Sequence, residues 1–342
     1  MTYFIGWDIG GAHVKVAVIY QNKIQQVLQA PCPLWQGLDK LEQALKNLFI
    51  QLPNDKKQHH AVTMTGELVD LFSSRNEGVE QIIQTVTRFL IDSNVQIFCG
   101  KFGLLPVDKV VENHYEAIAS ANWLASATFA AKHLQNGLFV DIGSTTTDIL
   151  RCENGEVLAQ GFSDYQRLIS QELIYTGIVR TPVMAVVQTV LDNEKNVGVM
   201  AEYFATMADV YRVTGELLEH CDQNPTADGA EKTLEASARR LVRMVGDDFN
   251  IEELSRWQAI AKNIRWQQLK RIQASCELLL QNQKIQLVGA GVGRFLVQEI
   301  AANLNLPYVD FSTLFETNEY LAFRPADCAP AVAVAYLLGN AQ

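Results

Sequence analysis

Two short motifs combine a carboxylate with a glycine-containing turn, which suits the binding of phosphate and a divalent cation. Asp8 and Asp141 each end an apolar segment and are each followed by Ile-Gly. Glycine lets the backbone approach an anion, and successive turn N–H groups can surround phosphate oxygens. Mg²⁺ prefers few carboxylates together with phosphate, so we predict that both aspartates hold Mg²⁺. The predicted phosphate-binding residues are Gly10, Gly11, His13, Lys15, Gly143, Ser144, Thr145 and Thr146.

A third, glycine-rich motif supports this prediction. One Asp-Ile-Gly motif alone is more often an ordinary hairpin turn, whereas two copies in the same register favour a function. Gly289, Gly291 and Gly293 lie between a predicted strand and a predicted helix, where a nucleotide or another phosphate could bind at the helix N-terminus. A dinucleotide-binding domain is not expected, because Arg294 replaces the last fingerprint glycine and only about 50 residues follow.

The residues around the two aspartates predict a pair of three-stranded antiparallel meanders. Residues 3–28 and 137–160 both consist of apolar segments joined by short polar turns, as expected for such strands. The matching aspartates are 133 residues apart, so we predict a duplicated α/β fold with domains at 1–133 and 134–342. The pattern also predicts an interdomain helix at 112–133, a nearly all-helical insertion in the second domain at about 165–282, and a C-terminal helix at 330–338.

Composition and charge narrow the class of protein. The chain has 342 residues, 48% of them hydrophobic, and a formal net charge of −10, which argues against disorder and against nucleic acid as a partner. No apolar run approaches the ~20 residues of a membrane span, and residues 1–10 lack the basic start of a signal peptide. Six scattered cysteines without a C-x-x-C pair make a disulfide framework or a zinc site improbable. We therefore expect a cytoplasmic protein.

The three motifs, in this order, resemble those of the actin/Hsp70/sugar-kinase superfamily. Residues 8–15 and 141–148 match its two phosphate loops, and residues 289–293 match its adenosine loop. The resemblance covers the layout of the whole chain. It implies two duplicated actin-like, or ribonuclease H-like, domains that flank a central ligand-binding cleft and close by a hinge motion.

Four further stretches resemble hydantoinase A-related proteins linked to tetrahydromethanopterin-dependent one-carbon transfer. These stretches are residues 62–70, 119–124, 175–183 and 201–209. In methanogens a member of this family makes a methanofuran precursor, and methylotrophic bacteria carry related proteins beside their formaldehyde-oxidation genes. The archaeal reaction joins the phenol of γ-glutamyltyramine to an aminomethylfuran-methanol diphosphate, which forms an aryl ether and releases diphosphate.

The chemistry implied by this resemblance assigns catalytic roles. Asp8 and Asp141, with the flanking Gly and Thr residues, would bind Mg-diphosphate. The phenol proton needs a general base, and Glu67 or Asp70 is expected to take it, because both follow a strand that ends in Thr65-Gly66 at a predicted rim.

Three residues are candidates for substrate binding, each with a structural alternative. Asn122 faces either the cleft or the interior. Asp148 either orients the substrate or caps its turn. Arg180 either binds a carboxylate, such as that of a glutamyl group, or forms a structural ion pair. Among the predicted phosphate-binding residues, His13 either donates to a phosphate or does not contact it, and Lys15 lies either beside phosphate or on solvated surface.

Other classes of function stay open at the level of sequence. An ATP-dependent small-molecule kinase or a hydantoinase-like amide hydrolase subunit would consume ATP, whereas the ether-forming reaction would not. A non-enzymatic nucleotide-binding scaffold is a further alternative. Mg²⁺ is the expected cofactor, with ATP as a second candidate. The expected partners are the diphosphate and phenolic amine substrates, without nucleic acid or membrane, and a homodimer would use the segment 165–282.

Overall fold

The computed structural model describes residues 2–91 and 93–340, and the chain divides into two compact units. Unit 1 consists of Met1–Phe139, Leu150–Ser170 and Val309–Gln342, and unit 2 consists of Val140–Ile149 and Gln171–Tyr308. The domains predicted at 1–133 and 134–342 follow the duplication in the sequence, and their boundaries stay a prediction.

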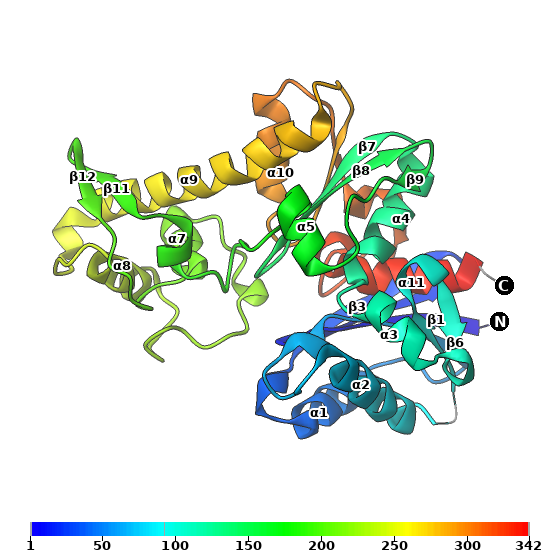
Figure 1. Cartoon of the computed structure of the whole chain (residues 1–342). Coiled ribbons are helices and arrows are strands. Elements are labelled where there is room, and N and C mark those ends of the chain that lie inside the picture. Colours follow the sequence, from blue (N-terminus) through cyan, green and yellow to red (C-terminus); the bar gives the residue numbers. More distant parts are fainter. Residues whose placement is uncertain (1, 92, 341–342) are drawn as a thin grey trace. The chain divides into compact units, whose positions relative to one another are not determined.

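Unit 1 contains a seven-stranded sheet (Figure 1). In chain order its strands are β1 (Thr2–Ile9), β2 (His13–Tyr20), β3 (Lys23–Pro31), β4 (Lys57–Met64), β5 (Asn94–Phe98), β6 (Leu104–Pro106) and β15 (Glu316–Thr317). Across the sheet their order is β15-β3-β2-β1-β4-β5-β6. The predicted N-terminal meander is confirmed, because β1 pairs antiparallel with β2 and β2 antiparallel with β3. On its other side β1 pairs in parallel with β4, which pairs in parallel with β5.

Helices cover both faces of this sheet. The helices of unit 1 are α1 (Leu38–Phe49), α2 (Arg75–Phe89), α3 (Tyr115–Ile118), α4 (Asn122–Leu134), α5 (Asp164–Ser170) and α11 (Ala329–Asn340). Ile5 and Trp7 of β1 are fully buried in one core with the apolar sides of α1 and α2. Gly6 points to the opposite face, where a Cβ atom would collide with the backbone of Ala331 in α11, so only glycine allows this approach. Asp8 is two residues after Gly6 in β1, and alternate residues of a strand share a face, so the Asp8 side chain points to the same face of the sheet as Gly6.

The second sheet repeats the order of the first. Its strands are β7 (Gly137–Ile142), β8 (Thr147–Glu153), β9 (Glu156–Val157), β10 (Leu173–Ile174), β13 (Leu287–Ala290) and β14 (Tyr308–Asp310). Across the sheet the order is β10-β8-β7-β13-β14, with β9 also pairing with β8. The strands β8, β7, β13 and β14 thus correspond to β2, β1, β4 and β5. This correspondence confirms the predicted duplicated α/β fold.

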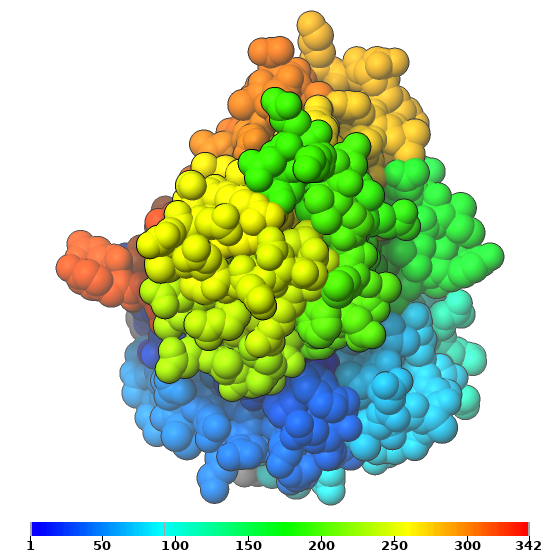
Figure 2. All heavy atoms as spheres, turned by 90° about the vertical axis from the view of Figure 1, so that its left-hand side faces the viewer, coloured from blue at the N-terminus to red at the C-terminus, as the bar shows by residue number. Residues whose placement is uncertain are grey.

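The remainder of unit 2 is less helical than the sequence predicts for 165–282. Its elements are α6 (Val183–Val186), β11 (Thr189–Asp192), β12 (Lys195–Gly198), α7 (Met207–Thr214), α8 (Leu234–Arg243), α9 (Leu254–Leu280) and α10 (Arg294–Asn303). α7, α8 and α9 pack on one another, and α8 and α9 dominate the yellow-green and yellow surface in Figure 2. β11 and β12 form a hairpin. The two residues of its turn, Asn193 and Glu194, have φ of 45° and 65°, as a type I′ turn requires. The prediction of a nearly all-helical insertion is therefore wrong.

Within 2–91 and 93–340, no helix combines the length and the hydropathy that a membrane span requires.

Candidate active site

The first predicted phosphate turn joins β1 to β2 in unit 1. The Gly10 N–H donates to the His13 carbonyl oxygen at 2.9 Å, which closes the turn. A Cβ atom at Gly11 would lie 2.8 Å from Cγ1 of Val69, so this position is closely packed. Lys15 is directly opposite Asp8 in the β1–β2 register, which places both side chains on one face. The structure thus brings the five predicted residues of this turn together, and their binding of phosphate stays a prediction.

The second predicted turn, in unit 2, is closed by the equivalent hydrogen bond. The Gly143 N–H donates to the Thr146 carbonyl oxygen at 2.9 Å, 133 residues after the Gly10–His13 pair. The hydroxyl oxygens of Ser144 and Thr145 are 3.3 Å apart. Arg180 places a guanidinium nitrogen 3.5 Å from Thr145 Oγ1. Backbone donors, hydroxyl groups and a cation are therefore gathered at one turn, which is the combination that an anion requires.

A neighbouring segment, residues 176–181, holds the second turn in position. The N–H groups of Ile178 and Val179 donate to the carbonyl oxygens of Gly143 and Ser144, both at 3.1 Å, and the Arg180 N–H donates to Ser144 at 2.8 Å. Gly177 is packed so tightly that a Cβ atom would lie 2.5 Å from the Ser144 carbonyl carbon and 2.6 Å from the Gly143 carbonyl oxygen. The glycine therefore determines how closely the segment approaches the turn.

Two buried side chains from the helical part of unit 2 support this segment. Gln268 of α9 donates to Thr176 Oγ1 at 2.7 Å and to the Gly177 carbonyl oxygen at 2.9 Å. Tyr211 of α7 donates to Gln268 Oε1 at 2.6 Å. Thr147, at the start of β8, donates to the Thr176 carbonyl oxygen at 2.7 Å. Neither Gln268 nor Tyr211 is marked by a local sequence motif, because each lies far along the chain from the turn.

The glycine-rich loop after β13 packs against the end of β7, also in unit 2. Gly291 has a φ of 78°, and a Cβ atom there would collide with Asp141 Oδ1 and the Ile142 carbonyl oxygen. The Gly293 N–H donates to that same carbonyl oxygen at 2.8 Å. Gly291 therefore lies against the predicted metal-binding Asp141, and Gly293 lies against the next residue, Ile142. Gly289 instead lies against the ring of Tyr308.

The predicted helix at 112–133 is interrupted, so that prediction is wrong. α3 ends at Ile118, α4 begins at Asn122, and Ser120 between them has a φ of 52°, which disfavours a helix and costs a non-glycine residue free energy. Ser120 Oγ donates to Glu67 Oε1 at 2.8 Å. Asn122 Nδ2 donates to Asp8 Oδ1 at 3.3 Å. The interruption thus presents two polar side chains to two of the predicted catalytic residues.

Glu67 is the buried end of a chain of polar groups in unit 1. It is 1% exposed, and burial raises the pKa of its carboxyl group. Ser120 Oγ lies 2.8 Å from Glu67 Oε1 and 3.2 Å from Asp164 Oδ2, and Arg75 binds the same Asp164 oxygen at 2.7 Å. One hydroxyl group carries one proton, so Ser120 can donate to only one of these two carboxylates at a time. Glu67 Oε2 is buried without a hydrogen-bond partner among the described residues.

The remaining candidates differ in position. Asp70 is exposed, whereas Glu67, three residues earlier, is buried rather than at a rim. Asp148 is paired with Leu173 in the β8–β10 register. Within the described part of the chain, no three His, Cys, Asp or Glu side chains cluster as a metal site. Asp8 in unit 1 and Asp141 in unit 2 each lie beside a phosphate-type turn of their own unit, and a carboxylate in that position fits Mg²⁺ held together with a phosphate ligand.

Comparison with known proteins gives matches over most of the chain. A family model described as hydantoinase/oxoprolinase matches residues 58–327. A protein of Methanocaldococcus jannaschii named (4-{4-[2-(gamma-L-glutamylamino)ethyl]phenoxymethyl}furan-2-yl)methanamine synthase is 35% identical over 245 residues, which are 71% of this chain and 72% of that protein. A Methanococcus vannielii protein with the same name is 31% identical over 125 residues, 36% of this chain and 56% of that protein.

One solved structure supports the fold. The nucleotide-free structure of acetone carboxylase, from work on ATP-dependent acetone carboxylation, aligns with a TM-score of 0.56 at 10% identity. The alignment covers 97% of this chain and 69% of that one. At this identity the similarity concerns the fold alone, and it agrees with the duplicated sheets described above.

Proposed function

The chain belongs to the hydantoinase/oxoprolinase family, and we propose that it is a synthase in the biosynthesis of a methanofuran-type one-carbon carrier. The observation that carries this proposal is the 35% identity, over 71% of the chain, to a synthase whose product contains a phenoxymethylfuran. In the proposed reaction an aminomethylfuran-methyl group moves from its diphosphate to the phenol oxygen of γ-glutamyltyramine or a close analogue. The new bond is an aryl ether, and diphosphate leaves.

Each of the two turns, considered within its own unit, is suited to bind a phosphate group. Their N–H groups, the hydroxyl groups of Ser144 and Thr145 and the guanidinium of Arg180 can stabilise the negative charge that develops as the C–O bond to diphosphate breaks. Electrostatic stabilisation of this kind is usually the largest contribution to catalysis. Asp8 and Asp141 would hold Mg²⁺, which supplies further charge neutralisation at the leaving group when bound.

Glu67 is the proposed acceptor of the phenol proton. As the phenol oxygen forms its bond to the furan methylene carbon, its proton moves to Glu67 Oε2, which lacks a hydrogen-bond partner among the described residues. Burial raises the pKa of Glu67, which makes its carboxylate a stronger base than an exposed one. Asp70, by contrast, is exposed to solvent. Ser120 and Asn122 act as positioning residues, since each contacts a carboxylate rather than the reacting atoms.

The test combines the protein with Mg²⁺, the furan diphosphate and γ-glutamyltyramine, with and without ATP, and follows product mass and diphosphate release. We expect ether formation without ATP. Asp8→Asn and Glu67→Gln should each abolish it while the far-UV circular dichroism stays unchanged. Glu42→Gln, at an exposed position of α1, is the matched control for Glu67→Gln and should keep full activity.

Two results would contradict the proposal in different ways. ATP-dependent phosphorylation of a substrate without any ether product would indicate a kinase instead. Ether formation at the normal rate in both Asp8→Asn and Glu67→Gln would keep the reaction but refute the assigned residues.

A further inference from the structure

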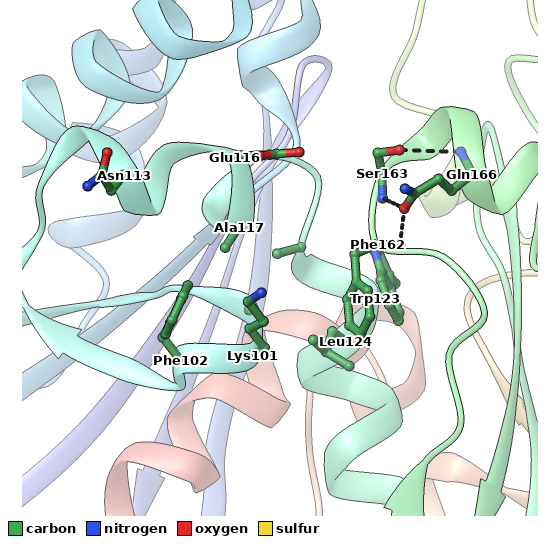
Figure 3. A pocket seen from close by; sticks show the side chains of 12 residues that line it. Lys101, Phe102, Asn113, Glu116, Ala117, Trp123, Leu124, Phe162, Ser163 and Gln166 are labelled. Carbon is green, nitrogen blue, oxygen red and sulfur yellow. Dashed lines mark hydrogen bonds between the residues drawn. The ribbon is translucent and has the colours of Figure 1, made fainter.

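A pocket of about 270 Å³ in unit 1 adjoins the segment that contacts the predicted catalytic carboxylates (Figure 3). Ala121, Trp123 and Leu124 are among the residues that line this pocket. Ala121 is flanked in the chain by Ser120, which binds Glu67, and by Asn122, which binds Asp8. A ligand in this pocket would therefore lie against the backbone segment that carries Ser120 and Asn122.

One wall of the pocket is aromatic and held in place. Trp123 is 3% exposed, and the centre of its ring lies 6.5 Å from the centre of the Phe162 ring. The guanidinium carbon of Arg167 lies 3.9 Å from the centre of the Trp123 ring. Gln166 Oε1 accepts hydrogen bonds from the N–H groups of Phe162 at 2.9 Å and Ser163 at 3.3 Å (Figure 3). The Trp123 indole N–H has no hydrogen-bond partner among the described residues. Phe162 therefore contributes an exposed aromatic ring to this wall, and the buried Trp123 indole N–H beside it is an unused donor.

Two charges of opposite sign also line the pocket. Lys101 and Glu116 are exposed, and neither forms an ion pair with a residue that the structure describes. The Lys101 ammonium lies 5.3 Å from the centre of the Phe102 ring. Unpaired charges on a surface are usually only solvated, but here both belong to one pocket with an aromatic wall. An α-amino acid group presents the complementary pair, a carboxylate for Lys101 and an ammonium for Glu116.

We propose that this pocket binds the glutamyl end of the phenolic acceptor, with Lys101 and Glu116 as the residues that distinguish a glutamylated phenol from a simple one. This assignment rests on the proposed function, which supplies γ-glutamyltyramine as the acceptor. Its amide carbonyl provides an acceptor for the Trp123 N–H, and its hydrocarbon chain lies against the Trp123–Phe162 wall. The adjoining segment then directs the phenol towards Glu67 and Asp8.

The test compares γ-glutamyltyramine with tyramine, which has the same phenol but no amino acid group. Lys101→Met and Glu116→Gln should each raise KM and Kd for γ-glutamyltyramine by about three- to tenfold and leave both values for tyramine unchanged. Lys132→Met, at an exposed position of α4, is the matched control and should change neither substrate. Both variants replace exposed side chains, so the fold should be retained.

Ether formation by the wild-type protein tests the proposed function, and Kd values measured by calorimetry test the pocket assignment independently of it. If the wild-type protein forms ether and both pocket variants keep its preference for γ-glutamyltyramine, the pocket assignment is overturned while the reaction stands. If the wild-type protein forms no ether, the proposed function is overturned, and the Kd values of the two pocket variants for γ-glutamyltyramine still decide the pocket. Unchanged Kd values overturn it, and weakened values support it.

Discussion

Replacing Gly177 by alanine tests whether the segment 176–181 positions the second phosphate turn. The added Cβ would lie 2.5 Å from the Ser144 carbonyl carbon and 2.6 Å from the Gly143 carbonyl oxygen, whereas ordinary contacts begin at 3.4 Å. Both atoms belong to the backbone, so no side chain can rotate away. The turn and the segment must separate by about 0.9 Å, which weakens the hydrogen bonds from Ile178, Val179 and Arg180.

Gly177→Ala should lower the free energy of unfolding moderately and the catalytic activity strongly. Overpacking of this kind lowers the free energy of unfolding by about 1–3 kcal/mol, which is less than the ~5–15 kcal/mol by which folded proteins are usually stable. The variant should therefore fold with a lower melting temperature. A misplacement of about 1 Å at a site of reaction can lower the rate by about 100-fold, so we expect kcat/KM for ether formation to fall by that order.

The assay pairs Gly177→Ala with Gly198→Ala. Gly198 ends β12 in the same unit, and a Cβ atom there meets no atom within 4 Å. The control should keep the wild-type melting temperature and rate of diphosphate release. If Gly177→Ala also keeps both, the segment 176–181 does not set the geometry of the turn and the reasoning is refuted.

The remaining predictions concern buried polar groups. Burial raises the pKa of Glu67, so its contribution to stability is lost as the pH rises from its ordinary value through the raised one. Glu67→Gln should therefore gain melting temperature relative to the wild type as the pH increases, and a pH-independent difference would contradict this. Gln268→Leu leaves Thr176 and Tyr211 without their partner and should lower the urea midpoint by the equivalent of about 2–4 kcal/mol; an unchanged midpoint would show that the network contributes nothing. Ser120 has a positive φ, so Ser120→Gly should be about 1 kcal/mol more stable than Ser120→Ala in thermal unfolding, and the reverse order would exclude backbone strain there.

The parts of the site that depend on local sequence could be predicted. An Asp-Ile-Gly motif at the end of an apolar strand defines both its turn and the face of its aspartate, because these follow from residues within a few positions. The matching closures from Gly10 to His13 and from Gly143 to Thr146 are the structural counterpart of the repeated motif. The order of the two sheets could likewise be inferred from the duplicated meander, since equivalent strands recur in equivalent places.

The parts of the site that depend on residues far apart in the chain could not be predicted from the sequence. Gln268 lies 92 positions from the Thr176 hydroxyl that it binds, and nothing in the local pattern of α9 distinguishes it from a surface glutamine. The hairpin of β11 and β12 was also missed, because its turn residues, Asn193 and Glu194, are not the Asn-Gly pair that signals such a turn most strongly. In both cases the structure depends on a contact or a backbone conformation that the local sequence pattern does not encode.

The interrupted helix at Ser120 shows why one such error matters for function. The helical pattern at 112–133 places residues 120 and 122 about 200° apart around an axis, so a continuous helix would direct Ser120 and Asn122 to nearly opposite sides. Their partners are close together, since a Cβ atom at Gly66, beside Glu67, would lie 3.2 Å from the carbonyl oxygen of Ile9, beside Asp8. Only a break in the helix lets Ser120 reach Glu67 while Asn122 reaches Asp8. The strained backbone at Ser120 is thus a requirement of the site rather than a defect of the helix.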